Sequence, residues 1–280
     1  LEPDSKITDD MIDDSLDDKQ KEIAHQRLWS FYEDTRSFSL VANQFAYDIP
    51  ITVNKIHAVK ADTQPLIFMT QAEWNLRHWD TNTSTGDPTH YGIWNGQLRI
   101  YPRPSTADST TTLGAAISST TATSITVASS SGFNRGDYYR FIIDSEVIYA
   151  TASTSTTFTG CLRGQEGTTA ATHSNGATVT ERSVVYDVHV EPDKLVDTQQ
   201  RTAIREPDVL MYGVAIDLAP LVGKEALIPL FESKYERRMK SLRENYSSKQ
   251  TVKHGRIKDM TEVLGSQNLR DPRDYPQDIG

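Results

Sequence analysis

The sequence predicts an α+β protein with a helical bundle, a small β-sheet region and an inserted all-β domain. Residues 206–246 repeat apolar side chains every three to four positions, which is typical of amphipathic helices. Residues 36–61 and 91–101 instead alternate apolar and polar side chains in short runs separated by turn residues. Residues 108–182 shift to Thr, Ser, Ala and Gly but keep short alternating runs, which indicates a separate β domain.

The N-terminal helix is predicted to begin after Thr8 and to reach about Tyr32. Thr8 is a good N-cap, and the carboxylates of Asp9 and Asp10 suit the positive end of a helix. The apolar face of this helix is expected to carry Ile12, Leu16, Ile23 and Phe31. This helix supplies the first member of the bundle.

Short strands are predicted from residue 36 to residue 61, and residues 65–80 have a helix-like pattern anchored by Trp74 and Trp79. The pair Asn95-Gly96 then stands between alternating apolar residues. Both residue types tolerate positive φ, so this pair predicts a β-hairpin.

Two interpretations compete for residues 108–182: a disordered linker or a folded β insert. Folding is favoured because disordered tracts lack alternating large apolar residues. Here these residues are Tyr139, Phe141, Ile143, Val147 and Tyr149. The strand-like run 184–190 could pair with residues 98–101, which would make the insert an excursion between two neighbouring strands.

Two further helices are predicted between Glu206 and Tyr246. Pro207 suits a first helical turn, and Gly223 is a plausible stop between the two helices. The second helix has an apolar stripe made of Leu227, Phe231, Tyr235, Met239, Leu242 and Tyr246. Its opposite face carries Lys234, Arg237, Lys240 and Arg243. The stripe is a packing surface with no arrangement for chemistry.

Composition narrows the function classes. The net charge of −9 argues against a general nucleic-acid coat, and the single cysteine, Cys161, excludes an internal disulfide framework. No apolar run approaches the roughly 20 residues of a membrane span, so we expect a soluble product of the cell interior or part of an assembly made there. Residues 1–34 are acidic and residues 224–258 are basic. These are either two solvated faces or complementary surfaces of neighbouring subunits.

No motif for catalysis, cofactor binding or metal binding stands out, so we expect neither an enzyme nor a cofactor. The chain has no phosphate loop, dinucleotide fingerprint, zinc-protease motif or Cys-x-x-Cys pair, and its seven histidines lack ligand spacing. The carboxylates between Asp13 and Asp18 lack the glycine and closing glutamate of a calcium loop. Asp144 and Glu146 fall on one face of a predicted strand and are interpreted as paired surface acids.

Three short motifs suggest a family. They are Phe45-x-Tyr47-x-Ile49-Pro50, Gly86-x-Pro88-x-x-Tyr91 and Leu98-x-Ile100-Tyr101-Pro102-x-Pro104. Together with the order of the predicted elements, they resemble head-to-tail adaptor (connector) proteins of tailed bacteriophages over residues 7–107 and 184–246. Separately, residues 161–179 resemble a small β module of phage tail and virion proteins, which the usual adaptor lacks.

The resemblance implies a structural virion protein at the head–tail neck, made in the host bacterial cytoplasm. Such adaptors form a ring, commonly of twelve subunits, that docks on the portal, extends the DNA channel and supports tail nozzle, tube or fibre proteins. Double-stranded DNA would pass without sequence recognition, and no membrane is involved. The implied division is an adaptor domain (1–107 and 184–248), an inserted β domain (108–183) and an extended C-terminal arm (249–280).

Residue roles follow from the same resemblance. The stripe from Leu227 to Tyr246 would pack in the wall of the ring, against the N-terminal helix. From composition alone, the arm is either a disordered tail or a segment that orders on a partner. The resemblance makes it the portal-binding arm, with contacts at Lys253, Arg256, Ile257, Met260, Val263, Leu264 and Tyr275.

Two other functions remain open at this stage. The chain could be another tail component, such as a nozzle, tube, fibre-anchoring or receptor-binding protein, or an enzyme that acts on cell-surface polysaccharide. Receptor-binding proteins tend to be almost wholly β and trimeric, whereas this chain has strong helical patterns at both ends. The mass of the protein with and without a portal would separate these classes.

Overall fold

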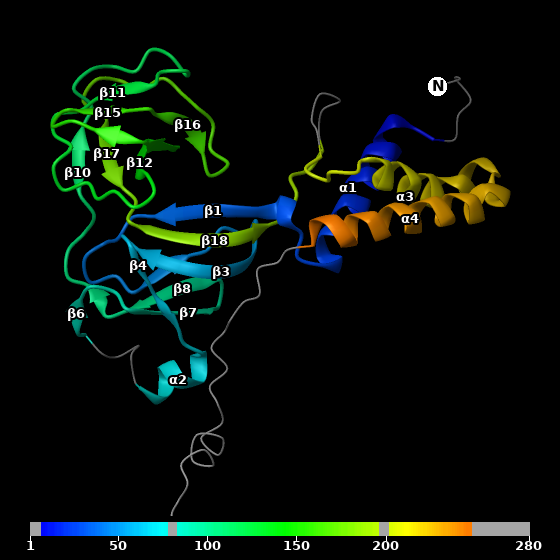
Figure 1. Ribbon diagram of the computed structural model, residues 1–280, viewed down its shortest axis with the longest axis horizontal. Coiled ribbons are helices and arrows are strands. Elements are labelled where there is room, and N and C mark those ends of the chain that lie inside the picture. The colour runs from blue at the N-terminus through cyan, green and yellow to red at the C-terminus, as the bar shows by residue number, and fades with distance from the viewer. Residues whose placement is uncertain (1–6, 78–82, 196–201, 248–280) are drawn as a thin grey trace, which may run out of the picture. The chain divides into compact units, whose positions relative to one another are not determined.

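A computed structural model describes residues 7–77, 83–195 and 202–247 of the chain (Figure 1). These residues form both helices and β-sheets, which agrees with the predicted α+β class. Helices lie at both ends of the described chain, and the strands lie between them in the sequence.

The first helix, α1 (Asp9–Gln26), begins where the sequence predicts. The side chain of Thr8 accepts a hydrogen bond from the Met11 N–H at 3.3 Å, which satisfies one of the free donors of the first turn. The predicted end at about Tyr32 was wrong, because Arg27 is extended with φ −163°. A separate 3₁₀ turn, η1 (Ser30–Tyr32), follows.

Two helices near the C-terminus, α3 (Asp208–Leu218) and α4 (Ile228–Tyr246), pack against each other, and α3 also contacts α1. Gly213 permits the close approach of α1, since a Cβ there would lie 2.7 Å from the Lys19 Cγ. The 3₁₀ turns η2 (Ala219–Val222) and η3 (Glu225–Leu227) connect α3 to α4. Gly223 stands between them in the left-handed conformation (φ 65°), as the predicted stop requires.

One hydrophobic core joins these helices. We call α1, α3 and α4 with η1 to η3 the helical cluster. Its core combines α1, the α1–β1 link, α3 and α4 through the buried residues Ile23, Trp29, Tyr32, Ile204, Val209, Leu210, Met239 and Leu242. This core therefore brings together residues from both ends of the described part of the chain.

The first sheet has the order β1-β18-β3-β4 with antiparallel neighbours. Its strands are β1 (Glu33–Phe38), β18 (Val184–Val190), β3 (Val53–Ala61) and β4 (Gln64–Pro65). The predicted pairing of residues 184–190 with residues 98–101 was therefore wrong. Five of the seven β18 residues are buried, which fits a central strand that needs a partner on each side.

A second sheet has the order β2-β8-β7-β5. Its strands are β2 (Ala46–Asp48), β8 (Gln97–Tyr101), β7 (His90–Trp94) and β5 (Ile67–Phe68), and the last two are parallel. The predicted hairpin is confirmed: Asn95 (φ 55°) and Gly96 (φ 70°) connect β7 to β8. Both sheets contribute to one core that includes Tyr47, Val59, Ile100 and Val188.

The helix expected over residues 65–80 is shorter in the described part of that segment. The helix α2 (Gln71–Leu76) begins after Thr70, whose side chain and the Glu73 carboxylate form a capping box. Residues 67–68 belong to β5 instead, and Trp79 lies outside the described residues. Trp74, the other predicted anchor, is fully buried. Nearby, β6 (Thr85–Gly86) pairs in parallel with β9 (Arg103–Pro104).

Residues 108–183, here called the insert, form strands in two sheets. One sheet has the order β10-β17-β12-β13-β16, and the other has the order β11-β15-β14. The strands are β10 (Thr110–Thr112), β11 (Ser124–Thr126), β12 (Tyr139–Ile143), β13 (Glu146–Ala150), β14 (Ala152–Ser153), β15 (Thr157–Thr159), β16 (Leu162–Gln165) and β17 (Thr178–Glu181). They enclose an apolar core that includes Ile125, Phe141, Ile143, Phe158 and Val179.

Hydrogen bonds tie the two ends of the insert together. The Asp108 carboxylate accepts from the Ser183 N–H at 2.9 Å and from the Ser183 hydroxyl at 2.7 Å. The same carboxylate accepts from the Leu40 N–H at 3.0 Å, next to β1. Farther along β1, Glu166 of the insert accepts from both the N–H and the hydroxyl of Ser37. The insert is thus fastened to the first sheet by carboxylates that it carries.

Candidate assembly interface

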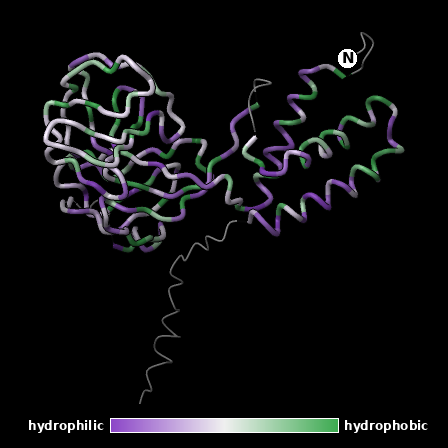
Figure 2. Tube along the Cα trace, turned by 45° about the horizontal axis from the view of Figure 1, so that its top comes forward, coloured by the Kyte–Doolittle hydropathy of each residue, from purple (hydrophilic) through white to green (hydrophobic). Residues whose placement is uncertain are grey.

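The helical cluster leaves large apolar side chains exposed. Met239 and Leu242 are fully buried between the helices, as a closed core requires. Apolar side chains nevertheless remain exposed on α3, on the turns that follow it and on the start of α4. Figure 2 shows hydrophobic residues along the backbone of these helices. They are Met211 (65% exposed), Leu221 (42%), Val222 (41%), Leu227 (42%) and Leu230 (51%), which we call the open apolar patch.

The sequence of α3 explains part of this patch. The helix reads DVLMYGVAIDL, so apolar residues occur on nearly every side of it. Val209, Leu210 and Val214 are buried, whereas Met211 points away from the core. A helix that is apolar all round is normally covered on all sides. Met211 is therefore the apolar residue of α3 that stays uncovered within a single chain.

The predicted stripe on α4 divides into two parts. Met239 and Leu242 are fully buried, and Tyr235 and Tyr246 pack at the edge of the same core. Phe231 is half-buried. Leu227 lies in η3, before α4 begins, and is exposed. The C-terminal part of the stripe packs within the chain, and the N-terminal part is open; its role in a ring wall stays a prediction.

Charge is distributed unevenly over the helices. The exposed side of α1 is acidic, with Asp9, Asp10, Asp13, Asp14 and Asp18. On α4, Arg238 pairs with Asp208 at 2.8 Å, and Lys234 lies 5.3 Å from the ring centre of Tyr212. Arg237, Lys240 and Arg243 remain exposed. The nearest acids to Lys240 and Arg243 lie 3.9 Å away on α4 itself, so these charges are only loosely compensated.

A histidine pair joins the first sheet to the α1–β1 link. His189 of β18 donates from Nε2 to the Trp29 carbonyl at 3.0 Å, which leaves its Nδ1 to accept from the Nε2–H of His57. Burial lowers the pKa of both histidines. Trp29 is itself fully buried and donates to the Ile23 carbonyl at 2.7 Å. These contacts position the helical cluster against the sheet.

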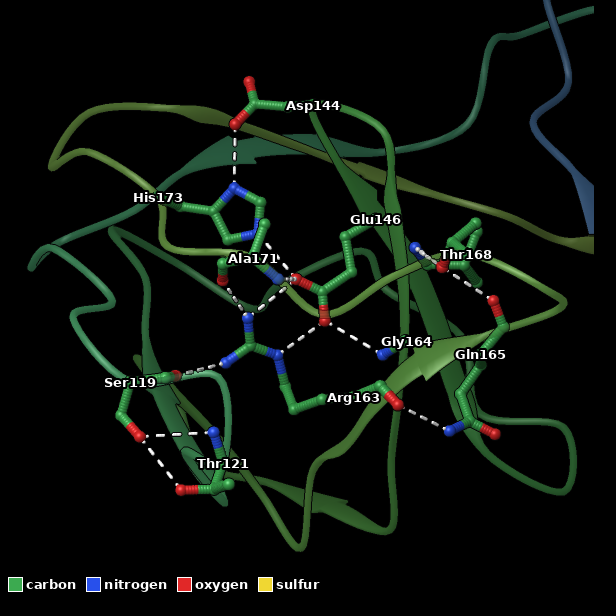
Figure 3. A network of polar contacts seen from close by, with 11 residues as sticks. Ser119, Thr121, Asp144, Glu146, Arg163, Gly164, Gln165, Thr168, Ala171 and His173 are labelled. Atoms are coloured by element: carbon green, nitrogen blue, oxygen red, sulfur yellow. Dashed lines mark hydrogen bonds and ion pairs between the residues drawn. The ribbon is translucent and has the colours of Figure 1, made fainter. Parts of the chain in front are cut away.

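A second candidate site is the polar network inside the insert (Figure 3). Glu146 is fully buried and accepts a bidentate pair from Arg163, with both N–O distances 2.7 Å. It also accepts from the N–H groups of Gly164 and Ala171 at 2.9 and 3.0 Å. His173 spans two carboxylates at 2.8 Å each, Glu146 through Nε2 and Asp144 through Nδ1.

This network is structural. Burial alone would raise the pKa of Glu146, but hydrogen bonds from Arg163, the Ala171 N–H, His173 and the Gly164 N–H outweigh it and lower the pKa to about 2. Glu146 is therefore ionised at neutral pH, both of its oxygen atoms accept hydrogen bonds, and it ties the segment from Arg163 to His173 onto β13. The prediction of paired surface acids was wrong, because Asp144 lies in a turn (φ 51°) and Glu146 is buried.

Four carboxylates line a cavity of about 320 Å³ where the insert meets the first sheet: Asp62, Asp87, Asp108 and Glu181. Burial raises the pKa of Glu181 to about 7 and also raises the pKa of Asp108. Both groups already accept backbone hydrogen bonds, Glu181 from Ser109 and Asn134 and Asp108 from Leu40 and Ser183. They fasten the linkers of the insert.

Metal binding and membrane crossing were the two other possibilities for the described residues. In the parts of the chain that the structure describes, no three His, Cys, Asp or Glu side chains are grouped so that they could hold a metal ion. In those same parts, no helix has both the length and the hydrophobicity that crossing a bilayer requires. The predicted arm residues from Lys253 to Tyr275 lie outside the described residues.

Comparison with known families decides the relationship. A family described as SU10 adaptor protein matches residues 1–157, more than half of the chain. The chain belongs to the SU10 adaptor protein family. The sequence resemblance to phage adaptors is thereby confirmed. No curated protein matches the chain.

The matched residues place the adaptor among bacteriophage structural proteins and imply a component of the virion. The match covers α1, the strands up to β9 and the insert as far as residue 157, whereas β18, α3 and α4 lie beyond it. The adaptor family is one in which an enzymatic site is not expected. The assembly surface of the adaptor consequently becomes the feature to explain.

Proposed function

We propose that the adaptor works as a ring at the neck of the phage, with twelve copies as the expected number. In this proposal the ring docks on the portal, extends the DNA channel and carries tail components. The helical bundle of α1, α3 and α4 forms the wall, and each copy packs against the next through the open apolar patch. The observation that carries the proposal is this patch, in which four of the five exposed apolar residues lie between Leu221 and Leu230, since large exposed apolar surfaces mark interaction sites.

Charge supports a head-to-tail contact. The exposed aspartates of α1 and the exposed Arg237, Lys240 and Arg243 of α4 belong to different helices, so each chain can offer both groups to its neighbours, although α4 also exposes Glu232, Glu236 and Glu244. A contact between two different faces closes into a ring when its rotation is right. Opposite charges at such a contact select the orientation of the neighbour.

The remaining parts take the roles that the resemblance implies. Residues 1–107 and 184–248 would form the adaptor domain, and residues 108–183 the inserted β domain. Residues 249–280 would be the arm that binds the portal. An arm that orders on its partner pays an entropic cost, which the many copies of a ring help to offset.

The mass of the protein with and without purified portal tests the ring. We expect about twelve copies bound to each portal, and a free protein that is either a monomer or a ring. A stable trimer, or a portal that binds no copies, would contradict the proposal. A truncation after Ser247 then tests the arm: Ser247 is kept because its hydroxyl accepts a hydrogen bond from Arg27 at 2.7 Å. The truncated protein should fold but no longer join portals.

The insert suggests a second role, as an anchor for fibre or nozzle proteins. Its strand β16 lies at the edge of a sheet and carries the exposed side chain of Leu162 (44% exposed). An open edge can accept a strand from a partner. Particles assembled with residues 109–182 deleted should keep the ring and lose this partner; particles that keep every fibre and nozzle protein would remove this role.

A further inference from the structure

Arg140, in strand β12 of the insert, is a buried arginine without a carboxylate. Only 7% of the residue is exposed, and its Nε has no hydrogen-bond partner. Among the described residues, no carboxylate lies within 4.0 Å of its guanidinium. Arg163 in the same domain is paired with a carboxylate, as buried arginines usually are, since both oxygen atoms of Glu146 face its guanidinium. A buried cation without an anion is costly, so Arg140 needs an explanation.

Aromatic rings compensate for part of this charge. The guanidinium carbon of Arg140 lies 4.8 Å from the ring centre of Tyr149 and 5.8 Å from that of Tyr138. The Tyr149 hydroxyl is a hydrogen-bond partner of Arg140 and donates to Glu166 at 3.0 Å. Ring faces attract a cation but accept no in-plane N–H group. The Nε–H of Arg140 is left without an acceptor, and Nε itself is shielded from solvent, so a ligand would approach the guanidinium from its Nη atoms.

A cavity of about 260 Å³ is lined by Arg140. Lys60 of β3 and Val185 of β18 form its wall on the side of the first sheet, and Gly136 forms part of the wall on the side of the insert. A Cβ on Gly136 would lie 3.9 Å from the Arg140 Nη1, in open van der Waals contact. The guanidinium therefore borders the cavity, with room for a small group beside it.

We propose that this cavity binds a carboxylate group, with Arg140 as its main charge partner and Lys60 as a second cation. The flat fork of a guanidinium matches the two oxygen atoms of a carboxylate. The exposed acids Asp62 and Asp137 also line the cavity and would repel a doubly charged phosphate more strongly than a single carboxylate. The carboxylate is either the side chain of an acidic residue on a partner protein or a small free acid.

Titration of the full-length protein tests the site and separates the two sources. The probes are sodium acetate and the blocked peptide acetyl-Gly-Glu-Gly-amide, with sodium chloride at equal ionic strength as the control. The readout is the Arg140 Nε–H signal in ¹H–¹⁵N spectra. Saturable shifts with both probes, at least ten-fold weaker with sodium phosphate, support the site. If the peptide binds more tightly than acetate, the site is assigned to the acidic side chain of a partner. If the two bind equally, the site is assigned to a small free acid. No saturable shift with either probe overturns the proposal.

A matched pair of variants avoids the risk that replacing Arg140 unfolds the insert. Gly136→Asp places a carboxylate beside Arg140, and Gly136→Asn has nearly the same shape without the charge. The φ of Gly136 lies outside the left-handed region, so both side chains are tolerated. We expect the Asp variant to melt several degrees above the Asn variant and to lose the acetate response. Equal melting temperatures together with an unchanged acetate response would contradict the proposal.

The nearby acids give a second control. If Arg140 paired with Asp62 or Asp137 in solution, no external carboxylate would be needed. We expect Asp62→Asn and Asp137→Asn to bind acetate two- to five-fold more tightly, because each removes a repelling charge. Loss of the acetate response, or a large loss of thermal stability in either variant, would show that the acid is the partner of Arg140 and would overturn the proposal.

Discussion

The insert and the helical cluster of the adaptor differ in how many large apolar side chains they expose. Within residues 108–183, Leu162 is the one large apolar side chain that is exposed, and the fully buried Glu146 meets five donors. The helical cluster has ordinary buried residues such as Met239 but exposes Met11 on α1 and the five residues of the open apolar patch. The insert buries nearly all of its large apolar side chains within one chain, whereas the helical cluster leaves several of them for a partner to cover. Assembly is therefore expected at the helices.

The largest effect is expected inside the insert. Glu146→Gln removes the anion that Arg163 and His173 face, so it leaves a buried cation unpaired and should destabilise the insert by about 3–5 kcal/mol. Hydrogen exchange of the insert amides measures this loss. Asp144→Asn is the matched control, since the Asp144 side chain is 66% exposed and its replacement should cost less than about 1 kcal/mol. Equal losses in both variants would show that Glu146 is not the centre of the network.

A comparable loss of folding stability is expected when Met239 is replaced by alanine. The same replacement of Leu230, on the same helix, should cost little. Met239→Ala opens a cavity in the core of the helical cluster and should cost about 2–5 kcal/mol in urea unfolding. Leu230 is 51% exposed, so Leu230→Ala should change the stability of the single chain by less than about 1 kcal/mol. Its effect should appear in portal binding. A large loss of single-chain stability from Leu230→Ala would mean that the patch is covered within the chain.

Acid should weaken the insert before the helical cluster. The pKa of Glu146 is about 2 in the folded protein against an ordinary value of 4.5, so its contribution to stability is complete above about pH 4.5. That contribution is lost as the pH falls from about 4.5 to about 2. Near-UV circular dichroism and insert amide exchange should show a loss of structure over this pH range in the wild type. The same transition should be absent in Glu146→Gln. An unchanged window in the variant would assign the acid sensitivity to another group.

A smaller effect of opposite sign is expected near neutral pH. The pKa of Glu181 is raised to about 7 by burial, so the folded protein holds this proton more tightly than the unfolded chain. Stability should therefore fall as the pH rises from about 4.5 to about 7 and then level off. Urea midpoints at pH 5, 6, 7 and 8 measure this slope, and a midpoint that rises over that range would contradict the assignment.

The sequence predicted the ends of helices and the hairpin turn correctly where a single residue type determines the local backbone conformation. Thr8 marks the start of α1, Asn95-Gly96 forms the hairpin, and Gly223 ends the segment after α3. The end of α1 was misplaced because Trp29 and Phe31 continue the apolar spacing in a 3₁₀ turn that packs on the same core. Periodicity shows which residues face the core and does not show where helical hydrogen bonding stops.

Long-range pairing could not be predicted from the same signals. β18 pairs with β1 and β3 although residues 98–101 have an equally suitable pattern, because strand pairing depends on the topology of the whole chain. The network of Glu146, Arg163 and His173 joins residues up to 27 positions apart, and each of them is unremarkable in the sequence. The same holds for Arg140, whose lack of a carboxylate is visible only in three dimensions.

The most direct test is a cryo-electron microscopy map of the phage neck. We expect a closed ring of about twelve adaptors in which the open apolar patch, with Met211 and Leu230, is buried against the next copy. We also expect that the acidic side of α1 faces the basic side of a neighbouring α4. A neck in which this patch faces solvent, or in which the adaptor is absent from the ring between portal and tail, would contradict the account.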